Sequence, residues 1–536
     1  MPSVLVIAGG DISNKLPHLR AGFACPALIP LNTRPLASYV IEFYRDGHDI
    51  HLFVDEAFLE EVRRELPPGR HGYTLHGVFR GLGVVDTLQQ ALTVVKDEED
   101  VIVNLVTTIP VEIPGPEEVQ GGCLPAHSTS DWSAISRGPK GLDFHAKGTD
   151  RPDDALAFTG VFRLPGTVLV SAASSAVRRQ DLLSVVESAA LLTPLSLKEV
   201  EWIDCGHETN YYKSRASLIN SRSFNRLRVD SRRGTIVKSS SDKEKLAREV
   251  SYLETLPPGL RILFPRLVSV SGSEGRVDSY EMEYYGYPNL AEYLIYWNLS
   301  RESWWRCFDG LHTTLSLFRE HPASIGPSSY RDFHWNKTVA RIESYLTSIP
   351  DASLRDTLSN SGLNIGGLAI PPLSKLLAAA EQVITQAYRE QEFGTVHGDY
   401  CFNNILFDVA SGIVRLIDPR GSFGPSLTGT FGDWRYDLAK LSHSSIGHYD
   451  YMVNGLFEVV REAPASFRLD LGLRPNAPWL QEMTRWLVSE QGADPREISV
   501  MTALLFLSMC PLHADDSQRQ LAFFLRGLEL LTQALD

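Results

Sequence analysis

The chain has 536 residues, of which 43% are hydrophobic, 10% aromatic and 22% charged. This composition excludes a mostly disordered, collagenous or coiled-coil protein, and the length predicts more than one domain. Lys and Arg number 51 against 65 for Asp and Glu, a formal net charge of −14. A chain this acidic is poorly suited to binding a nucleic-acid backbone or an anionic membrane surface, although a local basic patch could bind a small phosphorylated ligand.

The cysteines and the N-terminus indicate a cytoplasmic protein. The six cysteines are far apart and none forms a C-x-x-C pair, which predicts reduced thiols rather than a zinc site or disulfide framework. The opening MPSVLVIAGGD lacks the basic region and long apolar run of a secretion signal. No stretch approaches the ~20 apolar residues of a membrane span, and the oligomeric state stays open.

Strands and helices alternate over the first hundred residues. The strands are expected at 4–9, 49–56 and 100–106, and the helices at 36–47, 57–66 and 85–95. This alternation predicts an α/β domain with a mostly parallel sheet covered on both faces. Residues 114–152 are rich in Gly, Pro, Ser and Asp and are expected to form loops around a site, before further sheet at 157–170.

A different pattern begins after residue 222. Residues 223–240 predict an antiparallel hairpin, 242–256 a helix and 280–285 a strand, and the chain beyond Pro288 is mainly helical except near 395–420. We therefore expect domains at 1–221 and 222–536, the second with a small lobe at 222–286 and a helical large lobe at 287–536.

The strongest chemical signal is the pair of segments TVHGDYCFNNILFD (Thr395–Asp408) and VRLIDPRGSFG (Val414–Gly424). Asp399 lies on a tight loop, Asn404 follows five residues later, and a second short strand ends at Asp418. Phosphoryl transfer from Mg-ATP requires this layout, with one carboxylate to orient the acceptor hydroxyl and an amide and a carboxylate to hold Mg²⁺.

These segments resemble the aminoglycoside phosphotransferase and choline kinase-like family, whose catalytic loop reads H-G-D-x-x-x-x-N and whose metal strand reads I-D. The resemblance implies an α+β bilobal protein-kinase-like domain. It also implies that Asp399 is the catalytic base, that Asn404 and Asp418 are metal ligands, and that His397 braces the loop. GDWRYDLAKL (Gly432–Leu441) resembles the family's downstream segment, in which Asp437 would be structural.

Such kinases hold the ATP phosphates with a strand lysine paired to a helix glutamate. Lys238 ends an apolar strand, and Glu249 on the following helix is expected to pair with it, with Glu244 as the rival. Glu281–Tyr285, including Met282, falls where a hinge would receive adenine through backbone groups. The alternative for this segment is a plain core strand.

The chain lacks a G-x-G-x-x-G loop and an A-P-E segment, which favours a small-molecule kinase over a protein kinase. Aromatic residues of the helical lobe could cage a quaternary ammonium such as choline, or could simply be core: Trp297, Trp304, Trp305 and Trp335.

The first domain resembles the sugar nucleotidyltransferase superfamily. The resemblance rests on AGGD (Ala8–Asp11), CPALIPLNTRPLASYVI (Cys25–Ile41), LAFTGVFRL (Leu156–Leu164) and EWIDCGHETNYYKSRASL (Glu201–Leu218). It implies that Gly9 and Gly10 approach a nucleotide and that Asp204 is a metal ligand.

Two positions depart from that family's pattern. Pro26 stands where most relatives carry a lysine, and Thr107 stands near where they carry the second metal-binding aspartate. Loss of a hard anionic ligand should weaken Mg²⁺ binding, unless Asp11, Asp131 or Asp143 compensates.

The fusion resembles capsular polysaccharide biosynthesis proteins that phosphorylate a small alcohol and link it to a nucleotide. We expect an ATP- and Mg²⁺-dependent kinase acting on a small-molecule hydroxyl, with an attached nucleotidyltransferase-like domain of doubtful activity. The alternatives are a bifunctional enzyme that also uses CTP or another NTP, and a sugar-nucleotide-binding sensor or scaffold. The sequence does not identify the acceptor.

Overall fold

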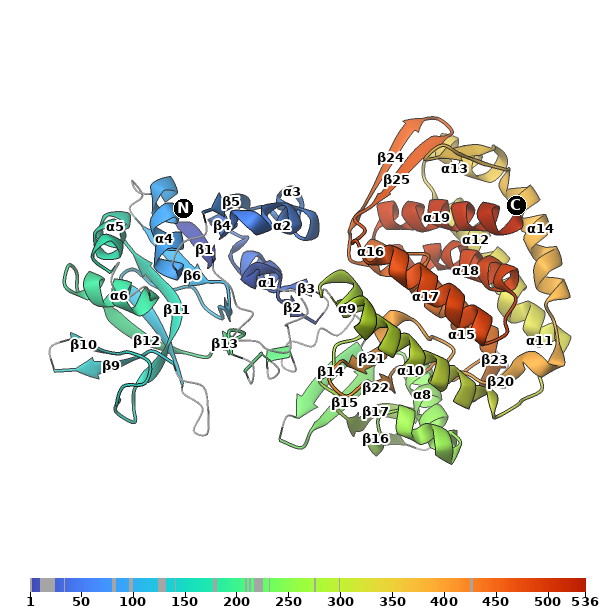
Figure 1. Ribbon diagram of the computed structural model, residues 1–536, viewed down its shortest axis with the longest axis horizontal. Helices are drawn as coiled ribbons and strands as arrows, with labels where there is room; N and C mark the ends of the chain where they lie inside the picture. Colours follow the sequence, from blue (N-terminus) through green and yellow to red (C-terminus); the bar gives the residue numbers. More distant parts are fainter. Residues whose placement is uncertain are drawn as a thin grey trace. The chain divides into compact units, whose positions relative to one another are not determined.

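The computed structural model divides the chain into two compact units (Figure 1). Unit 1 is Met1–Leu218 with Tyr296–Asn298, and unit 2 is Ile219–Ile295 with Leu299–Asp536. The structure describes residues 2–9, 25–32, 34–79, 83–95, 100–123, 132–139, 141–176, 181–207, 210–211, 214–215, 225–230, 232–273, 276–297, 299–424 and 428–536.

Unit 1 is built on a nine-stranded sheet with the order β10-β9-β11-β6-β1-β4-β5, in which β8 pairs with β11 and β12. The strands are β1 (Ser3–Ala8), β4 (Asp49–Asp55), β5 (Thr74–Val78), β6 (Val101–Leu105), β8 (Glu118–Gly122), β9 (Ala134–Gly138), β10 (Gly141–His145), β11 (Leu156–Leu164) and β12 (Ser196–Val200). Short pairs are formed by β2 (Pro30–Leu31) with β3 (Arg34–Pro35) and by β7 (Thr108–Ile109) with β13 (Ile203–Asp204).

The sheet is mixed, where the sequence predicted a mostly parallel one. β6, β1, β4 and β5 run parallel, but β11 runs antiparallel to β6, β8 and β9. Three strands, β8 to β10, lie within the segment that was expected to form loops. The glycines of β8 favour loops when the sequence is considered alone. In the structure they allow close packing of the strand, since a Cβ on Gly122 would lie 2.2 Å from the Trp202 side chain.

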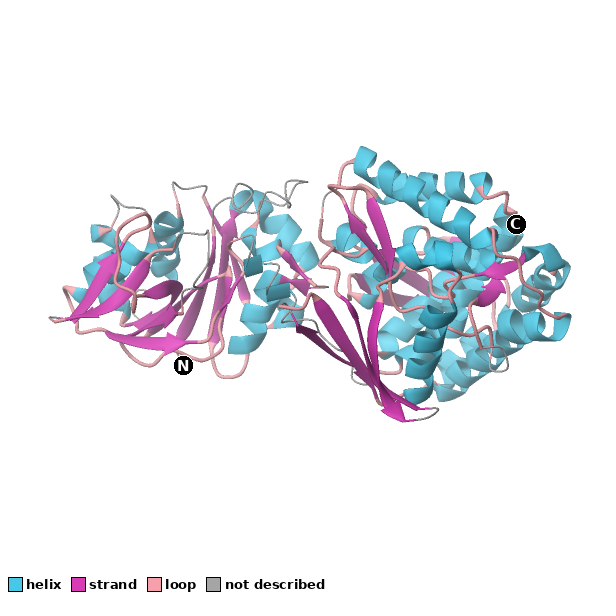
Figure 2. Cartoon of the chain, turned by 90° about the horizontal axis from the view of Figure 1, so that it is seen from below, coloured by secondary structure: helices cyan, strands magenta, loops and turns pink. Residues whose placement is uncertain are grey.

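Helices cover both faces of this sheet (Figure 2). Leu5 and Ile7 of β1 pack in the core cluster with α4 to α6, whereas the alternate residues Val4 and Val6 are equally buried on the other face. On that face Tyr44 donates a hydrogen bond to Asn104 at 3.1 Å. The helices are α1 (Leu36–Tyr44), α2 (Leu59–Glu65), α3 (Pro68–His71), α4 (Val84–Val95), α5 (Gly166–Ser175) and α6 (Leu182–Ala190).

Unit 2 begins with a four-stranded antiparallel sheet of order β14-β15-β17-β16, packed against one helix. Its elements are β14 (Asn225–Asp230), β15 (Thr235–Ser240), α8 (Lys243–Thr255), β16 (Leu267–Ser273) and β17 (Arg276–Glu283). These bounds confirm the predicted hairpin and the helix that follows it.

The rest of unit 2 is mainly helical, as predicted. The helices are α9 (Leu290–Ile295), α10 (Arg301–Arg319), α11 (Pro327–Arg331), α12 (Lys337–Ser348), α13 (Ala352–Asn360), α14 (Leu373–Gln386), α15 (Trp434–Ser445), α16 (Tyr449–Val453), α17 (Ala477–Glu490), α18 (Pro495–Met509) and α19 (Ser517–Leu535). Within the described residues, no helix combines the length and apolarity that a membrane span requires.

Short strands interrupt the helices of unit 2. Two antiparallel pairs are formed by β20 (Phe393–Thr395) with β23 (Phe431–Asp433) and by the hairpin of β21 (Ile405–Asp408) and β22 (Ile413–Leu416). A sheet that the sequence did not predict joins β18 (Leu363–Ile365), β19 (Leu368–Ile370), β24 (Phe457–Ala463) and β25 (Ser466–Leu471).

Candidate functional site

Lys238 lies at the centre of a charge cluster in unit 2. Side chains alternate along β15, so Lys238 shares the buried face with Ile236 and lies opposite Tyr280 of β17. Only 2% of the lysine side chain is exposed, and its Nζ lies 2.8 Å from Glu249 Oε2 and 2.8 Å from Asp418 Oδ1. Burial alone would lower the pKa of Lys238, but these two carboxylates outweigh it and raise the pKa.

Glu249, rather than Glu244, forms this ion pair. Helix α8 begins at its N-cap Asp242, whose side chain accepts from the backbone N–H of Lys245, and Glu249 points from α8 toward β15. Tyr280 donates a further hydrogen bond to Glu249 at 2.9 Å. Glu244 is 90% exposed and lies 3.7 Å from Arg248. Burial, and then Asp418, raise the pKa of Glu249 against the opposing effect of Lys238.

Asp418 follows β22 and has an unusual backbone conformation. Its φ is +55°, a left-handed value that is uncommon outside glycine and is retained in proteins mostly where function requires it. Lys238 engages one of its two carboxylate oxygens, and 38% of the side chain is exposed. Burial would raise the pKa of Asp418, but Lys238 holds it below its ordinary value.

The β21–β22 pairing brings Asn404 beside this aspartate. The backbone N–H of Ile417 donates to the carbonyl of Asn404 at 3.0 Å. The Asn404 amide nitrogen donates to the Asp399 backbone carbonyl and to its Oδ2, which directs the amide oxygen elsewhere. An amide oxygen and a partly exposed carboxylate are ligand types that fit Mg²⁺, which takes one or two protein ligands and completes its shell with phosphate and water. Among the described residues, no three His, Cys, Asp or Glu side chains are grouped as metal ligands.

Asp399 is oriented by two side chains. Besides Asn404, Lys440 of α15 lies 2.9 Å from its Oδ1. Burial would raise the pKa of Asp399, but Lys440, Arg420 and His397 outweigh it and hold the pKa below the usual range. The carboxylate is therefore ionised and able to accept a proton at neutral pH. Lys440 lies in the segment Gly432–Leu441, but its pairing with Asp399 was not predicted from the sequence pattern.

His397 connects the loop of Asp399 to the strand that ends at Asp418. Its Nδ1 accepts from the backbone N–H of Asp399 at 3.2 Å, and its Nε2 lies 3.0 Å from the carbonyl of Ile417. Burial lowers the pKa of His397 to about 4, so the ring is neutral at pH 7. Since Nδ1 accepts, Nε2 carries the proton and donates to Ile417. This geometry is that of a brace.

Asp437 holds the same loop from α15. Its two oxygens accept from the backbone N–H groups of His397 at 2.7 Å and Gly398 at 2.8 Å. Burial raises the pKa of Asp437 to about 7, although both N–H donors oppose the change. Its contacts are to the backbone of the loop, which fits a structural role.

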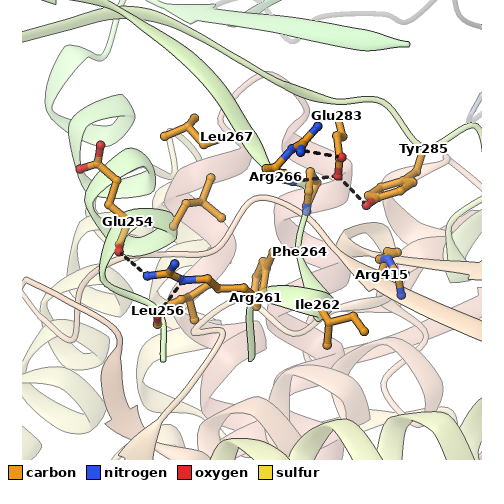
Figure 3. A pocket seen from close by; sticks show the side chains of 12 residues that line it. Glu254, Leu256, Arg261, Ile262, Phe264, Arg266, Leu267, Glu283, Tyr285 and Arg415 are labelled. Atoms are coloured by element: carbon orange, nitrogen blue, oxygen red, sulfur yellow. Dashed lines mark hydrogen bonds and ion pairs between the residues drawn. The ribbon is translucent and has the colours of Figure 1, made fainter. Parts of the chain in front are cut away.

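Met282 lies within the sheet, where its register partners are Ile236 of β15 and Leu267 of β16. Its side chain is part of the small core formed with α8. A cavity of about 710 Å³ lies next to the end of this strand, lined by Glu283 and Tyr285 together with Arg415 (Figure 3). Neither Lys238 nor Asp418 is among the residues that line this cavity.

Trp304, Trp305 and Trp335 pack against different partners. Trp304 is buried and stacks on Phe402 with ring centroids 6.1 Å apart, and Trp335 belongs to the large hydrophobic core. Trp305 instead contacts Trp486 edge to face. The geometry of Trp304 and Trp335 favours their interpretation as core residues.

In unit 1, Gly9 follows β1 and is in close contact with α4. A Cβ at Gly9 would lie 2.0 Å from Thr87 Oγ1, so glycine is required here. Gly10, Asp11 and Asp131 lie outside the described residues. Asp143 is exposed on β10.

Asp204 and Thr107 are neighbours in the structure. An ideal Cβ on Gly206 would lie 3.2 Å from Thr107 Oγ1 and 3.3 Å from Asp204 Oδ1. The Asp204 carboxylate accepts from the Gly206 N–H and from Asn210, each at 2.9 Å, and lies 2.8 Å from His207 Nδ1. Three donors on one carboxylate, with a hydroxyl as neighbour, form a poor Mg²⁺ site. Pro26 is buried at the start of a 3₁₀ turn.

No family model and no curated protein matches the chain. Solved structures are similar to its N-terminal part. A protein described as a glucose-1-phosphate thymidylyltransferase from Bacillus anthracis is 15% identical, with a TM-score of 0.34, covering 42% of this chain and 98% of that one. A UDP-glucose pyrophosphorylase is 14% identical (TM-score 0.33, 40% and 97% covered), and an inositol-1-phosphate CTP transferase from T. maritima is 15% identical (TM-score 0.32, 41% and 98% covered).

Proposed function

We propose that unit 2 is a small-molecule kinase that transfers the γ-phosphoryl group of ATP to a hydroxyl group. The observation that carries this proposal is the contact of Lys238 with both Glu249 and Asp418. A buried lysine between a helix glutamate and a loop carboxylate is the arrangement that holds ATP phosphates beside a metal ligand in phosphoryl transfer.

In the proposed reaction, Asp399 accepts the proton of the acceptor hydroxyl while that oxygen bonds to the γ-phosphorus. The bond from the γ-phosphorus to the β–γ bridging oxygen breaks, and ADP leaves. Lys238 offsets negative charge on the phosphates. Asn404 and Asp418 would hold Mg²⁺, which when bound neutralises charge on the β- and γ-phosphates.

ADP release from Mg-ATP in the presence of a panel of small alcohols tests this proposal. Asp399→Asn should lower turnover by about 10² or more, the usual scale for losing a general base, while Mg-ATP still binds. Asp408→Asn, which changes a partly buried carboxylate at the end of β21, is the matched control. Undiminished ADP formation by Asp399→Asn would contradict the assignment of the base.

For unit 1, we propose nucleotide binding with slow or no nucleotidyl transfer. The juxtaposition of Asp204 with Thr107 supports this, since position 107 carries a neutral hydroxyl in place of a carboxylate. Surface-polysaccharide biosynthesis, in which the phosphorylated alcohol is joined to CTP or another NTP, is the context that the motifs favour. Pyrophosphate release by the full chain, supplied with a phosphorylated alcohol and each NTP, distinguishes this proposal from a bifunctional enzyme. Nucleotide binding without pyrophosphate release would fit a sensor.

A further inference from the structure

Four cationic side chains form one group on an otherwise acidic chain, and two of them lie near Asp399. The four are Lys337 and Arg341 of α12, Arg420 after β22, and Lys440 of α15. Lys440 pairs with Asp399. Arg420 lies against the same loop, because its backbone N–H donates to the His397 carbonyl at 2.9 Å and a Cβ on Gly398 would lie 2.7 Å from its own Cβ.

Aromatic rings hold two of these cations near each other. The ring of Phe333 lies 3.8 Å from Lys337 Nζ and 5.1 Å from Arg420 Cζ, measured to its centroid. Arg420 also donates to the hydroxyl of Tyr436 at 3.1 Å. Phe333 belongs to a π-helical turn, Asp332–Asn336, directly before Lys337. Such turns are rare and frequently mark functional sites.

Among the described residues, three of these cations have no carboxylate in ion-pair contact, although Arg420 lies near enough to Asp399 to lower its pKa. Lys337, Arg341 and Arg420 form no ion pair with any described carboxylate, and Asp399 already faces Lys440. Burial, and then Arg420, Arg341 and Lys440, lower the pKa of Lys337 well below its ordinary value. Crowding like charges in a partly buried place costs free energy, and proteins retain such clusters mostly at functional sites.

We propose that the phosphoryl acceptor is an anionic alcohol whose carboxylate or phosphate group binds among Lys337, Arg341 and Arg420. This inference rests on the proposed kinase function. The acceptor hydroxyl must lie within hydrogen-bond reach of Asp399, so the rest of a small acceptor lies among the cations around it. A carboxylate or phosphate supplies the charge that the fold lacks, and arginine binds either group through paired donors. Choline and other cationic alcohols would be repelled.

Matched acceptors test the inference with the full-length chain and Mg-ATP. Glycerate and glycerol 3-phosphate represent the two kinds of anion, glycerol the neutral alcohol, and ethanolamine and choline the cations. We expect kcat/KM for one of the anions to exceed that for glycerol by about 10² or more. Lys337→Met should raise KM for that anion by about 10- to 100-fold, the range for losing one charged hydrogen bond, and leave the Kd of Mg-ATP unchanged.

Lys375→Met, an exposed lysine of α14, is the control, and Arg341→Gln replaces Lys337→Met if that variant does not fold. Preference for glycerol, ethanolamine or choline would overturn the inference while the kinase function stands. Weaker Mg-ATP binding by Lys337→Met would also overturn it, by assigning the cations to the nucleotide. Calorimetry could instead show that an anion binds and that Lys337→Met weakens this binding, while no ADP forms. That result would support the anion site and contradict the kinase function. Absence of both binding and ADP release overturns the anion site.

Discussion

The ammonium group of Lys238 lies 2.8 Å from Oδ1 of Asp418, a contact that joins the β15 sheet to the loop after β22. Glu249 engages the same ammonium group at 2.8 Å. Lys238 therefore lies between a helix carboxylate and the carboxylate that is proposed to bind the metal. These contacts position the ammonium group before the nucleotide binds. The two carboxylates and the ammonium group therefore balance one another's charge. Removal of any one of them should change the pKa of the other two.

Lys238→Met should weaken Mg-ATP binding and lower turnover by about 10² or more, because the phosphates lose their cation. It should also destabilise unit 2 by roughly 3 kcal/mol, because buried Glu249 loses its close counter-ion and keeps only Lys245, 3.9 Å away. Calorimetric titration with Mg-ATP and thermal unfolding measure the two effects.

The double variant Lys238→Met with Glu249→Gln separates the effect on stability from the effect on activity. It should recover stability, since the buried charge is gone, but not activity. Lys243→Met, at the start of α8, controls for loss of a lysine. Full activity in the double variant would contradict the phosphate-binding role of Lys238.

Lys440→Met should move an acid limb of the kcat profile into the measurable pH range. Lys440 holds the pKa of Asp399 below its usual range, so the wild-type base stays ionised across the range of the assay. Without Lys440, the raising effect of burial is opposed less, so the pKa of Asp399 rises and protonation of the base begins at a higher pH. The measurement is kcat at saturating acceptor from pH 4.5 to 8, with Lys440→Arg as the charge-preserving control. Identical profiles for Lys440→Met and wild type would separate Lys440 from the titration of the base.

His397→Gln should flatten the dependence of unfolding free energy on pH. The pKa of His397 in the folded state, about 4, lies below the ordinary value of 6.5. The neutral ring therefore contributes fully to the unfolding free energy above pH 6.5, and this contribution is lost as the pH falls toward 4. The difference amounts to about 3 kcal/mol over this window. Denaturant titrations of both proteins between pH 4 and 8 give the comparison, and parallel curves would show that the ring titrates normally.

Asp437→Ala should loosen the loop that carries Asp399. Two buried backbone N–H groups, those of His397 and Gly398, lose their acceptor, at a cost of about 3 kcal/mol. Hydrogen exchange at these two amides should accelerate, and turnover should fall while Mg-ATP still binds. Asp437→Asn retains one acceptor oxygen, so its exchange rates and turnover should lie between those of Asp437→Ala and wild type. Unchanged exchange in both variants would show that the loop is held by other contacts.

Thr107→Asp should raise pyrophosphate release by unit 1 if the missing carboxylate is what limits it. The new carboxylate would stand beside Asp204 and provide the second anionic ligand that Mg²⁺ favours. Thr107→Asn, of similar size and without charge, is the control. Wild-type turnover above about 1 s⁻¹, within the ordinary enzyme range, would instead show that other groups already supply the missing charge.

The candidate site could be predicted from sequence where its spacing is local. Asp399 and Asn404 share one loop, and the strand leading to Asp418 is short and apolar, so their proximity follows from the chain itself. Lys238 and Glu249 could be placed on a strand and the next helix, but which glutamate pairs with the lysine depends on how α8 faces β15.

The group of four cations could not be predicted in this way. Lys337 and Lys440 belong to α12 and α15, about a hundred residues apart, and no spacing rule relates them. Likewise, the strands β8 to β10 contain residues that usually favour turns. Their strand conformation depends on tertiary packing, as with Gly122 against Trp202, which overrides local preference.

The left-handed backbone at Asp418 has a consequence for the evolution of this chain. Glycine adopts φ +55° without strain, so a library selected for thermal stability alone should drift toward glycine at this position. Selection for phosphoryl transfer should keep aspartate. The residue that accumulates at position 418 under each selection would therefore reveal the trade-off between stability and activity at a single backbone torsion.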